Sequence, residues 1–343
     1  SLSFGGQSIT EEIQRTTAYA EDFPGPGDPT VSTGGTRLGF EQRQRVVNAG
    51  FFVQNVLDLS NKYFLTAGFR VDGNSAFGSD FGLQFYPKLS ASWVVSDEDF
   101  WGDKGQLKLR AAWGQSGRAP GAFDAVQTYQ GVGWGNSPAF YPGVLGNPDL
   151  GPERTAELEF GFDGSFFSDR VQVDFTYYDQ KTTDALFAVR QAASIGFGSS
   201  QLENVGEIGN KGMELTLNTV VFEGDVWAWD LGGSYSSNNS TVGLPEDVPE
   251  FSTGGGWIID GQPAPVMYGE CVTNPDAIAE PVIQDDCVIG PNSPTDIFAL
   301  NTSLTLPGGL RLSARGEYQG GHFVRAGVAH NAVRRSVVWA GCN

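Results

Sequence analysis

The sequence predicts an all-β protein and, within that class, part of an antiparallel transmembrane β-barrel. Apolar and polar residues alternate along segment after segment, which indicates strands with one apolar and one polar face. Tight turns alternate with long loops along the chain, and this asymmetry is typical of membrane barrels. No run approaches the ~18 apolar residues that a membrane helix needs, whereas a barrel strand needs only about ten alternating residues.

The segment 211–221 shows the alternation clearly. Met213, Leu215 and Leu217 share one face, and Glu214 and Thr216 share the other. The same pattern recurs in 107–113, 157–163, 171–178 and 310–318. A soluble antiparallel sheet with one wet face alternates in the same way, so the loop lengths must decide between the two.

Tight turns join four predicted strand pairs, at Ser60-Asn61, at Ser168-Asp169, at 223–225 and at 307–309. The pairs are 46–59 with 62–72, 155–167 with 170–181, 211–222 with 226–237, and 297–306 with 310–319. Strands near 86–93 and 107–113 and an incomplete one at 1–9 bring the total to about ten to twelve.

Long connections rich in Gly, Pro and Asn separate these pairs, at 73–84, 117–154, 182–210 and 238–295. The stretch 95–105 is expected on the side of the barrel that carries the short turns, where it forms a longer turn than the others. Short turns on one side of the membrane and long loops on the other are what a transmembrane barrel shows. The pattern therefore favours a barrel over a soluble sheet.

Aromatic residues are expected near strand ends, where barrels place interfacial girdles. Those that fit are Tyr63, Phe64, Trp93, Trp113, Phe166, Phe167, Trp227 and Trp229. An aromatic core of a soluble protein is the alternative explanation.

The net charge limits which partners the protein can bind, and the first residues bear on whether the chain is part of a larger protein. The formal charge of −19 argues against nucleic acid as a partner, because phosphate binding needs clustered Lys and Arg. Acidity that keeps loops soluble is one explanation, and attraction of cationic ligands is the other. The chain starts without a basic segment followed by an apolar core, so we expect it to begin inside a larger protein.

Catalytic chemistry is not indicated, and we expect no enzyme and no cofactor. The two histidines, His322 and His330, lie in a Gly-rich segment that we place in or beside an extracellular loop. Glu157 and Glu159 share a polar face and invite a two-carboxylate glycosidase interpretation. A wet barrel lumen explains these carboxylates better.

The acidic loop around Cys271 and Cys287 is the one place where the sequence predicts a covalent link. A disulfide between these two residues would close the loop, with two unpaired thiols as the alternative and Cys342 left over. The carboxylates of Asp285-Asp286 and of Glu246-Asp247 are oxygen ligands of the kind that Ca²⁺ binds, but neither stretch has the spacing of a calcium loop. A calcium site is therefore unsupported.

Ligand contacts are expected from aromatic side chains in the long loops, because aromatic faces suit apolar sugar faces or peptide side chains. The candidates are Tyr129, Trp134, Phe140 and Tyr141 in one loop and Trp257 in another. Packing of loop against loop is the alternative role.

Five motifs in order resemble those of the SusC/RagA-like TonB-linked outer-membrane proteins. They are RVDGNSAFG at 70–78, YPKLSASW at 86–93, LKLRAAWGQSG at 107–117, NPDLGPERT at 147–155 and NVGEIGNKGME at 204–214. Each is weak alone, but the order and spacing together are specific, and the resemblance covers roughly 46–325. Turn chemistry accounts for much of each motif, so these residues are expected to shape the barrel.

The resemblance implies a barrel of about 22 strands in the outer membrane of a Gram-negative-type bacterium. Residues 1–343 would be its C-terminal portion, with the N-terminal plug, the TonB-contacting region and the last strands outside this chain, since 334–343 does not read as a terminal strand. Such proteins import a nutrient, an oligosaccharide or a peptide, with a SusD-like surface lipoprotein as a lid. A non-transporting surface-display or adhesive barrel and a soluble β-rich binding domain remain as alternatives.

Overall fold

The structure is a computed structural model of the whole chain. It describes residues 1–343 except 28, 80, 136, 198–199, 277–279 and 329–343. His330, Cys342 and the segment 334–343 lie outside the described residues. Within the described part, no helix is long and apolar enough to cross a membrane.

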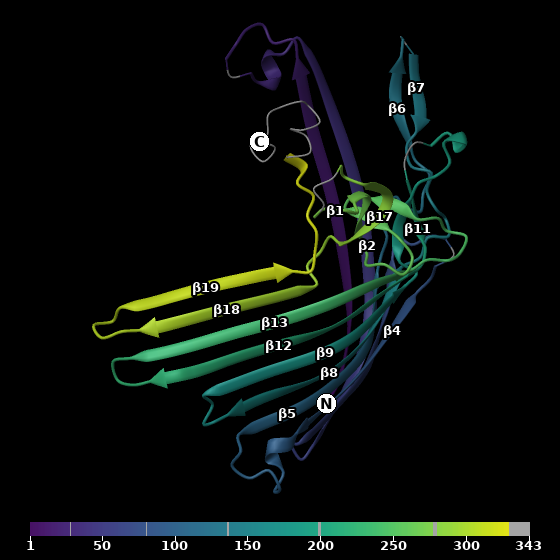
Figure 1. Cartoon of the computed structure of the whole chain (residues 1–343). Coiled ribbons are helices and arrows are strands. Elements are labelled where there is room, and N and C mark those ends of the chain that lie inside the picture. The colour runs from purple at the N-terminus through teal and green to yellow at the C-terminus, as the bar shows by residue number, and fades with distance from the viewer. Residues whose placement is uncertain (28, 80, 136, 198–199, 277–279, 329–343) are drawn as a thin grey trace.

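Eleven antiparallel strands form one large curved sheet, in the order β1-β2-β3-β4-β5-β8-β9-β12-β13-β18-β19. Figure 1 shows this sheet as a bent wall with the loops gathered at one end. The strands are β1 (Leu2–Glu21), β2 (Thr36–Leu59), β3 (Tyr63–Asn74), β4 (Gln84–Val94), β5 (Gln106–Arg118), β8 (Glu153–Phe166), β9 (Val171–Thr183), β12 (Glu207–Glu223), β13 (Ala228–Gly243), β18 (Asp296–Thr305) and β19 (Arg311–Gly320). The all-β antiparallel prediction is confirmed.

All four predicted hairpins are present, as β2–β3, β8–β9, β12–β13 and β18–β19. Positive backbone φ angles at Ser60, Asn61, Ser168 and Asp169 show how tightly the first two turns bend. The turn at 95–105 contains the short 3-10 helix η2 (Val95–Asp97). The alternation of short and long connections is therefore real.

Small β elements lie inside the long connections, where no strands had been predicted. They are β6 (Tyr129–Trp134) with β7 (Ser137–Pro142), β10 (Leu186–Val189) with β11 (Gln201–Asn204), and the four-stranded sheet of β14 (Phe251–Thr253), β15 (Gly256–Ile258), β16 (Val266–Val272) and β17 (Ile283–Pro291). Two further 3-10 turns are η1 (Val31–Thr33) and η3 (Ala193–Ile195). The loops therefore form a folded layer.

The first strand is much longer than the predicted 1–9, and β2 begins at Thr36 rather than at 46. Their added parts pair with each other, with Glu12 opposite Arg45 and Glu21 opposite Thr36. Glu11, Glu12 and other polar residues fall on both faces of this extension, so it shows no alternation to read. Figure 1 shows the two strands rising together past the other strands.

One face of the sheet carries an apolar band. On β8 this face presents Phe166, Phe162, Phe160 and Leu158, a span of roughly 26 Å along the strand. A strand tilted by about 40° would then cross roughly 20 Å, close to the ~25 Å apolar band of outer-membrane barrels. The band is thick enough to sit in a membrane, with the opposite face turned to the lumen.

Ion pairs mark the loop-side limit of the apolar band on this outer face. Lys211 contacts Asp179 at 2.7 Å, and Lys181 contacts Glu207 at 2.6 Å. In the strand register Asp179 lies opposite Leu158, at the level of Trp113. Trp113 therefore lies in the middle of β5 and not near its end as predicted, because the strands continue beyond the membrane level on the loop side.

The opposite limit carries aromatic residues beside the short turns. The rings of Tyr63 and Trp93 stack with centroids 6.1 Å apart, and Phe100 meets Trp93 edge to face at 6.5 Å. Trp229 on β13 pairs with Leu304 near the same side. These positions agree with the predicted interfacial girdle.

Glu98, in the turn after η2, fastens this aromatic group. It accepts hydrogen bonds from Tyr63 at 2.6 Å, from Lys62 at 3.0 Å and from Trp93 at 3.2 Å. The hydrogen bonds from Tyr63 and then Lys62 hold the pKa of the Glu98 carboxyl below its ordinary value of 4.5.

Because the pKa is lowered in the folded turn, Glu98 stabilises it above pH 4.5, and this contribution disappears as the pH falls through the lowered value. We expect the fluorescence of Trp93, taken as the difference between the wild type and Trp93→Phe, to change with a midpoint below pH 4.5. Glu98→Gln should abolish that transition. A midpoint at or above 4.5 would show that the contacts do not favour the ionised carboxylate.

Candidate functional site

The inner face of the sheet is polar from β3 to β12. Ser90 lies opposite Thr66 and Ala112, and further along this face Asp163 lies opposite Asp174. Alternation of side chains places these groups away from the apolar band. A polar inner face behind an apolar outer band is the lining of a wet lumen.

Arg110 is the centre of the main ion-pair cluster on this face. Its Nε donates to Asp163 at 3.0 Å, and its Nη2 donates to Asp174 at 3.0 Å and to Thr176 at 2.8 Å. Gly161 leaves the space that the guanidinium occupies, since a Cβ there would lie 3.0 Å from its Cζ. The cluster ties β5 to β8 and β9 electrostatically.

Glu157 and Glu159, the two carboxylates of the glycosidase interpretation, lie on the same inner face. Gln180 donates to Glu157 at 2.6 Å, and Asn210 donates onward to Gln180 at 3.3 Å. The side chains from β8, β9 and β12 thus form a hydrogen-bonded network in the wall. Among the described residues, no group of three or more His, Cys, Asp or Glu is placed to hold a metal ion.

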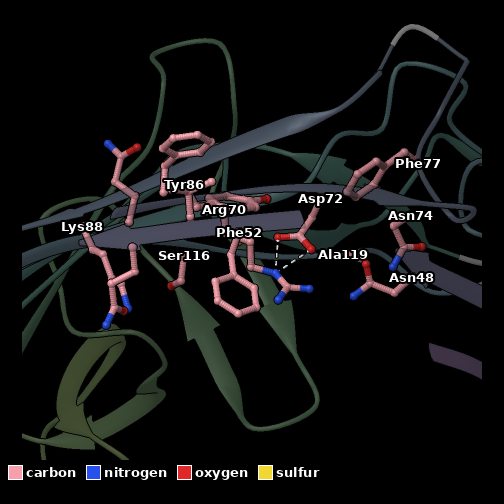
Figure 2. Close-up of a pocket in the computed structure, with 15 residues that line it drawn as sticks. Asn48, Phe52, Arg70, Asp72, Asn74, Phe77, Tyr86, Lys88, Ser116 and Ala119 are labelled. Carbon is pink, nitrogen blue, oxygen red and sulfur yellow. Dashed lines mark hydrogen bonds and ion pairs between the residues drawn. The ribbon is translucent and has the colours of Figure 1, made fainter. Parts of the chain in front are cut away.

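A pocket of about 620 Å³ lies on the inner face, at its loop-side end between β2 and β5. Figure 2 shows its aromatic, charged and amide side chains from neighbouring strands. The lining residues are Asn48, Phe52, Val53, Gln54, Phe69, Arg70, Asp72, Asn74, Phe77, Tyr86, Lys88, Gln115, Ser116, Gly117 and Ala119. The position of Asn74 beside a long loop puts the pocket at the extracellular mouth.

Glycines create the hollow. A Cβ at Gly50 would collide with the carboxylate of Asp72, and one at Gly117 would collide with the ring of Tyr86. Gly50 therefore allows Asp72 to pair with Arg70, whose Nε donates to both carboxylate oxygens at 2.7 and 2.8 Å. Side chains from adjacent strands lie over the bare backbone and leave the pocket between them.

Asn204, at the end of β11, joins the loops above the wall. Its side-chain oxygen accepts from the Gly151 amide at 2.7 Å, and its side-chain nitrogen donates to the carbonyls of Gly151 at 3.0 Å and Asp184 at 2.9 Å. The Gly78 amide donates to the carbonyl of Leu150, which is fully buried. Three connections, at 73–84, 117–154 and 182–210, are thus held together.

A second contact between loops is apolar. Val242, Phe251 and Ile258 form a buried cluster, against which Phe187 of the neighbouring loop packs with its ring 5.5 Å from that of Phe251. Cys271 of β16 and Cys287 of β17 are bonded in this layer, with Cα atoms 5.9 Å apart. We propose that this disulfide, predicted from the sequence, holds the β16–β17 hairpin in the natural protein.

The aromatic residues predicted to contact ligand do not come together. Tyr129, Phe140 and Tyr141 lie exposed on the β6–β7 hairpin, which Figure 1 shows standing away from the sheet. Trp257 packs on Tyr268 with ring centroids 5.0 Å apart, a contact between loop strands. Trp134 ends β6, and its side chain lies outside the described part.

His322 follows β19 on the loop side, as expected, and its Nδ1 is buried without a hydrogen-bond partner in the described part. The mouth pocket was missed by sequence reasoning, although its signal is present. Gly50, Gly68 and Gly114 lie on the luminal face of β2, β3 and β5, where a side chain would otherwise fill the lumen.

These features define a class of protein. A curved antiparallel sheet with an apolar outer band, a polar inner face and long folded loops at one end is the wall of an outer-membrane β-barrel. The family model for the TonB dependent receptor-like β-barrel matches residues 2–328. The chain belongs to this family, which lies in the outer membrane and consists of receptors and transporters, so the predicted location and the absence of an enzyme are confirmed.

Individual relatives agree with the family. The chain is 36% identical over 205 residues to TonB-dependent receptor P26 of Formosa agariphila, covering 57% of this chain and 20% of that protein. It is 28% identical over 197 residues to TonB-dependent receptor SusC of Bacteroides thetaiotaomicron, covering 54% of this chain and 20% of SusC. The matched part is thus about a fifth of each of these curated relatives.

A solved structure shows the same fold. The RagAB peptide importer in the "closed-closed" state superposes with a TM-score of 0.79 at 18% identity, covering 93% of this chain and 39% of that chain. The resemblance to SusC/RagA-like proteins, stated from motifs alone, is confirmed.

Proposed function

We propose that the chain is the barrel wall of a TonB-dependent importer that carries a nutrient across the outer membrane. The observation that carries the proposal is the polar inner face, which opens at the loop side into the mouth pocket. Its arginine, lysine, amide and aromatic side chains can bind a polar solute before passage. The family gives the energy source, TonB, which would act through a region outside this chain.

The proposed cargo is an oligosaccharide or a peptide. Support comes from the likeness to SusC and to RagAB, whose structure is described as a peptide importer. A SusD-like surface lipoprotein is the proposed lid over the loops. The loop layer, tied by Asn204 and by the Val242 cluster, would give such a lid a firm base. Residues 1–343 would then be the C-terminal barrel portion of a longer protein with its own plug.

Two other functions fit the structure less well. A soluble β-rich domain would bury an apolar face of its sheet, but here the largest buried side chains, Leu150, Val242 and Val266, include none from the middle of the sheet. The outer band instead leaves Phe160, Leu217 and similar residues exposed. A barrel that only displays loops would need no plug and no energy from TonB.

The test is uptake by the natural host. Cells that carry the complete gene should accumulate labelled oligosaccharides or peptides, and deletion of the gene should abolish accumulation of one of these classes. Deletion of TonB should have the same effect, while surface binding persists. Accumulation that is unchanged in both deletions would overturn the import proposal and favour a display barrel.

A further inference from the structure

We propose that the mouth pocket binds the carboxylate group of the imported ligand, with Lys88 as its counter-ion. This inference rests on the proposed function and names the chemistry of the cargo at one place in the wall. It starts from how the luminal cations of β3, β4 and β5 are paired. Arg70 pairs with Asp72, Lys108 and Arg110 pair with Asp163, and Arg110 also pairs with Asp174. Lys88 has no ion pair in the described part of the chain.

The strand register explains why Lys88 lacks a partner. Gly68 of β3 lies opposite Lys88 on one side, and Gly114 of β5 lies opposite it on the other. Cross-strand neighbours on one face are the residues best placed to pair with a charge. Both neighbours lack a side chain, so Lys88 has no partner on the adjacent strands. The next residue in this row is Glu157 of β8, which lies opposite Gly114 and accepts a hydrogen bond from Gln180.

The surroundings of Lys88 fit an anion that belongs to a larger organic ligand. Phe52 and Tyr86 line the same pocket and offer aromatic faces, and Gln54 offers an amide. Arg70 is a near neighbour of Lys88, since it lies opposite Tyr86 and two residues along β3 from Gly68. Because Arg70 pairs with Asp72, Lys88 is the cation lining this pocket that has no ion pair in the described part of the chain. Arg154, which lies near Tyr86, is hydrogen-bonded to Gln84.

A free carboxylate can come from an acidic sugar or from the C-terminus of a peptide. The shared chemistry is an anionic carboxylate next to a face that can stack on an aromatic ring. The site would therefore hold one end of the cargo at the mouth, above the level at which Trp113 marks the membrane boundary.

The experiment uses the full-length receptor in detergent and two matched pairs of probes. One pair is a trimer of galacturonic acid and its methyl ester, and the other is a tripeptide with a free C-terminus and the same peptide amidated. Isothermal titration should show tighter binding of the acid than of its uncharged counterpart in one pair. The pair that shows the preference identifies the source of the carboxylate.

Lys88→Gln should lower the affinity for the preferred acid about tenfold, as expected for loss of a charge-assisted contact. Binding of the uncharged probe should be unchanged. Lys108→Gln is the matched control, because Lys108 faces the same lumen but already has Asp163 as a partner at 3.8 Å. The control should keep the wild-type preference.

A second pair of variants keeps Lys88 in place. A Cβ at Gly114 would lie 3.6 Å from the Cβ of Lys88, an ordinary contact, so a side chain fits there. Gly114→Glu should supply an internal carboxylate that competes with the ligand, whereas Gly114→Gln, of equal size, should weaken acid and uncharged probes alike. Only the glutamate variant should remove the preference for the acid.

Two results would overturn the inference: a wild type that does not prefer either acid, or a Lys88→Gln variant that keeps the preference. Either can occur while TonB-dependent uptake continues, in which case the carboxylate site fails and the import proposal stands. If uptake does not depend on TonB but the preference for the acid remains, the import proposal is refuted and the carboxylate site stands.

Discussion

Asn204→Ala is expected to loosen the loop layer by about 2–3 kcal/mol, because it removes three hydrogen bonds that each contribute roughly 0.5–1.5 kcal/mol. The amide of Gly151 and the carbonyl of Asp184 would lose their side-chain partner. We expect faster hydrogen exchange and faster proteolysis in 147–151 and 184–204 of the full-length receptor, with the barrel strands unchanged.

Asn239→Ala is the control for this variant. Asn239 lies exposed near the loop-side end of β13 and has no side-chain hydrogen bond in the described part. Its replacement should leave exchange in both loops at the wild-type rate. Equal protection in the Asn204 variant and the wild type would show that the loops are held by apolar contacts such as that of Phe187 with Phe251.

Arg110→Met is expected to destabilise the barrel wall by about 1–3 kcal/mol, the range for removing a hydrogen-bonded charge from its partners. Asp163 and Asp174 lie opposite each other in the register, so the variant leaves two facing carboxylates without the shared guanidinium. The measurement is the temperature at which the folded receptor loses its faster migration on an SDS gel.

A second substitution separates charge from packing. Asp174→Asn in the Arg110→Met background should recover part of the lost stability, because it removes one of the two repelling charges. Lys108→Met should cost less, since its 3.8 Å contact with Asp163 is exposed and such pairs contribute about 0–1 kcal/mol. Equal losses for the Arg110 and Lys108 variants would contradict a central role for the guanidinium.

The membrane-level wall could be predicted from sequence because lipid and water impose opposite demands on its two faces. Met213, Leu215 and Leu217 had to alternate with polar residues, and the tight turns at Ser60-Asn61 and Ser168-Asp169 fixed the pairing of neighbouring strands. The extension of β1 beyond residue 9 could not be predicted, since water lies on both sides of it and no alternation is required there.

The site was harder to predict than the fold. Tyr129 and Phe140 were chosen for their chemistry, but exposed aromatic residues on a hairpin say nothing about which of them converge. The mouth pocket depends on which glycines lie opposite which side chains, as with Gly68, Lys88 and Gly114. That information is in the register of three strands, and a single sequence reports each strand separately.

The two-residue repeat of the wall has a consequence for how its gene can change. Replacing a luminal residue such as Gly114 alters what the interior offers to cargo and leaves the lipid-facing Trp113 where it was. Insertion or loss of one codon within β5 would instead turn every following side chain to the other face, bringing Arg110 or Lys108 against lipid. Point substitutions can therefore change cargo choice one residue at a time, whereas a length change within a strand must be absorbed by a bulge, as between Val220 and Phe222 of β12.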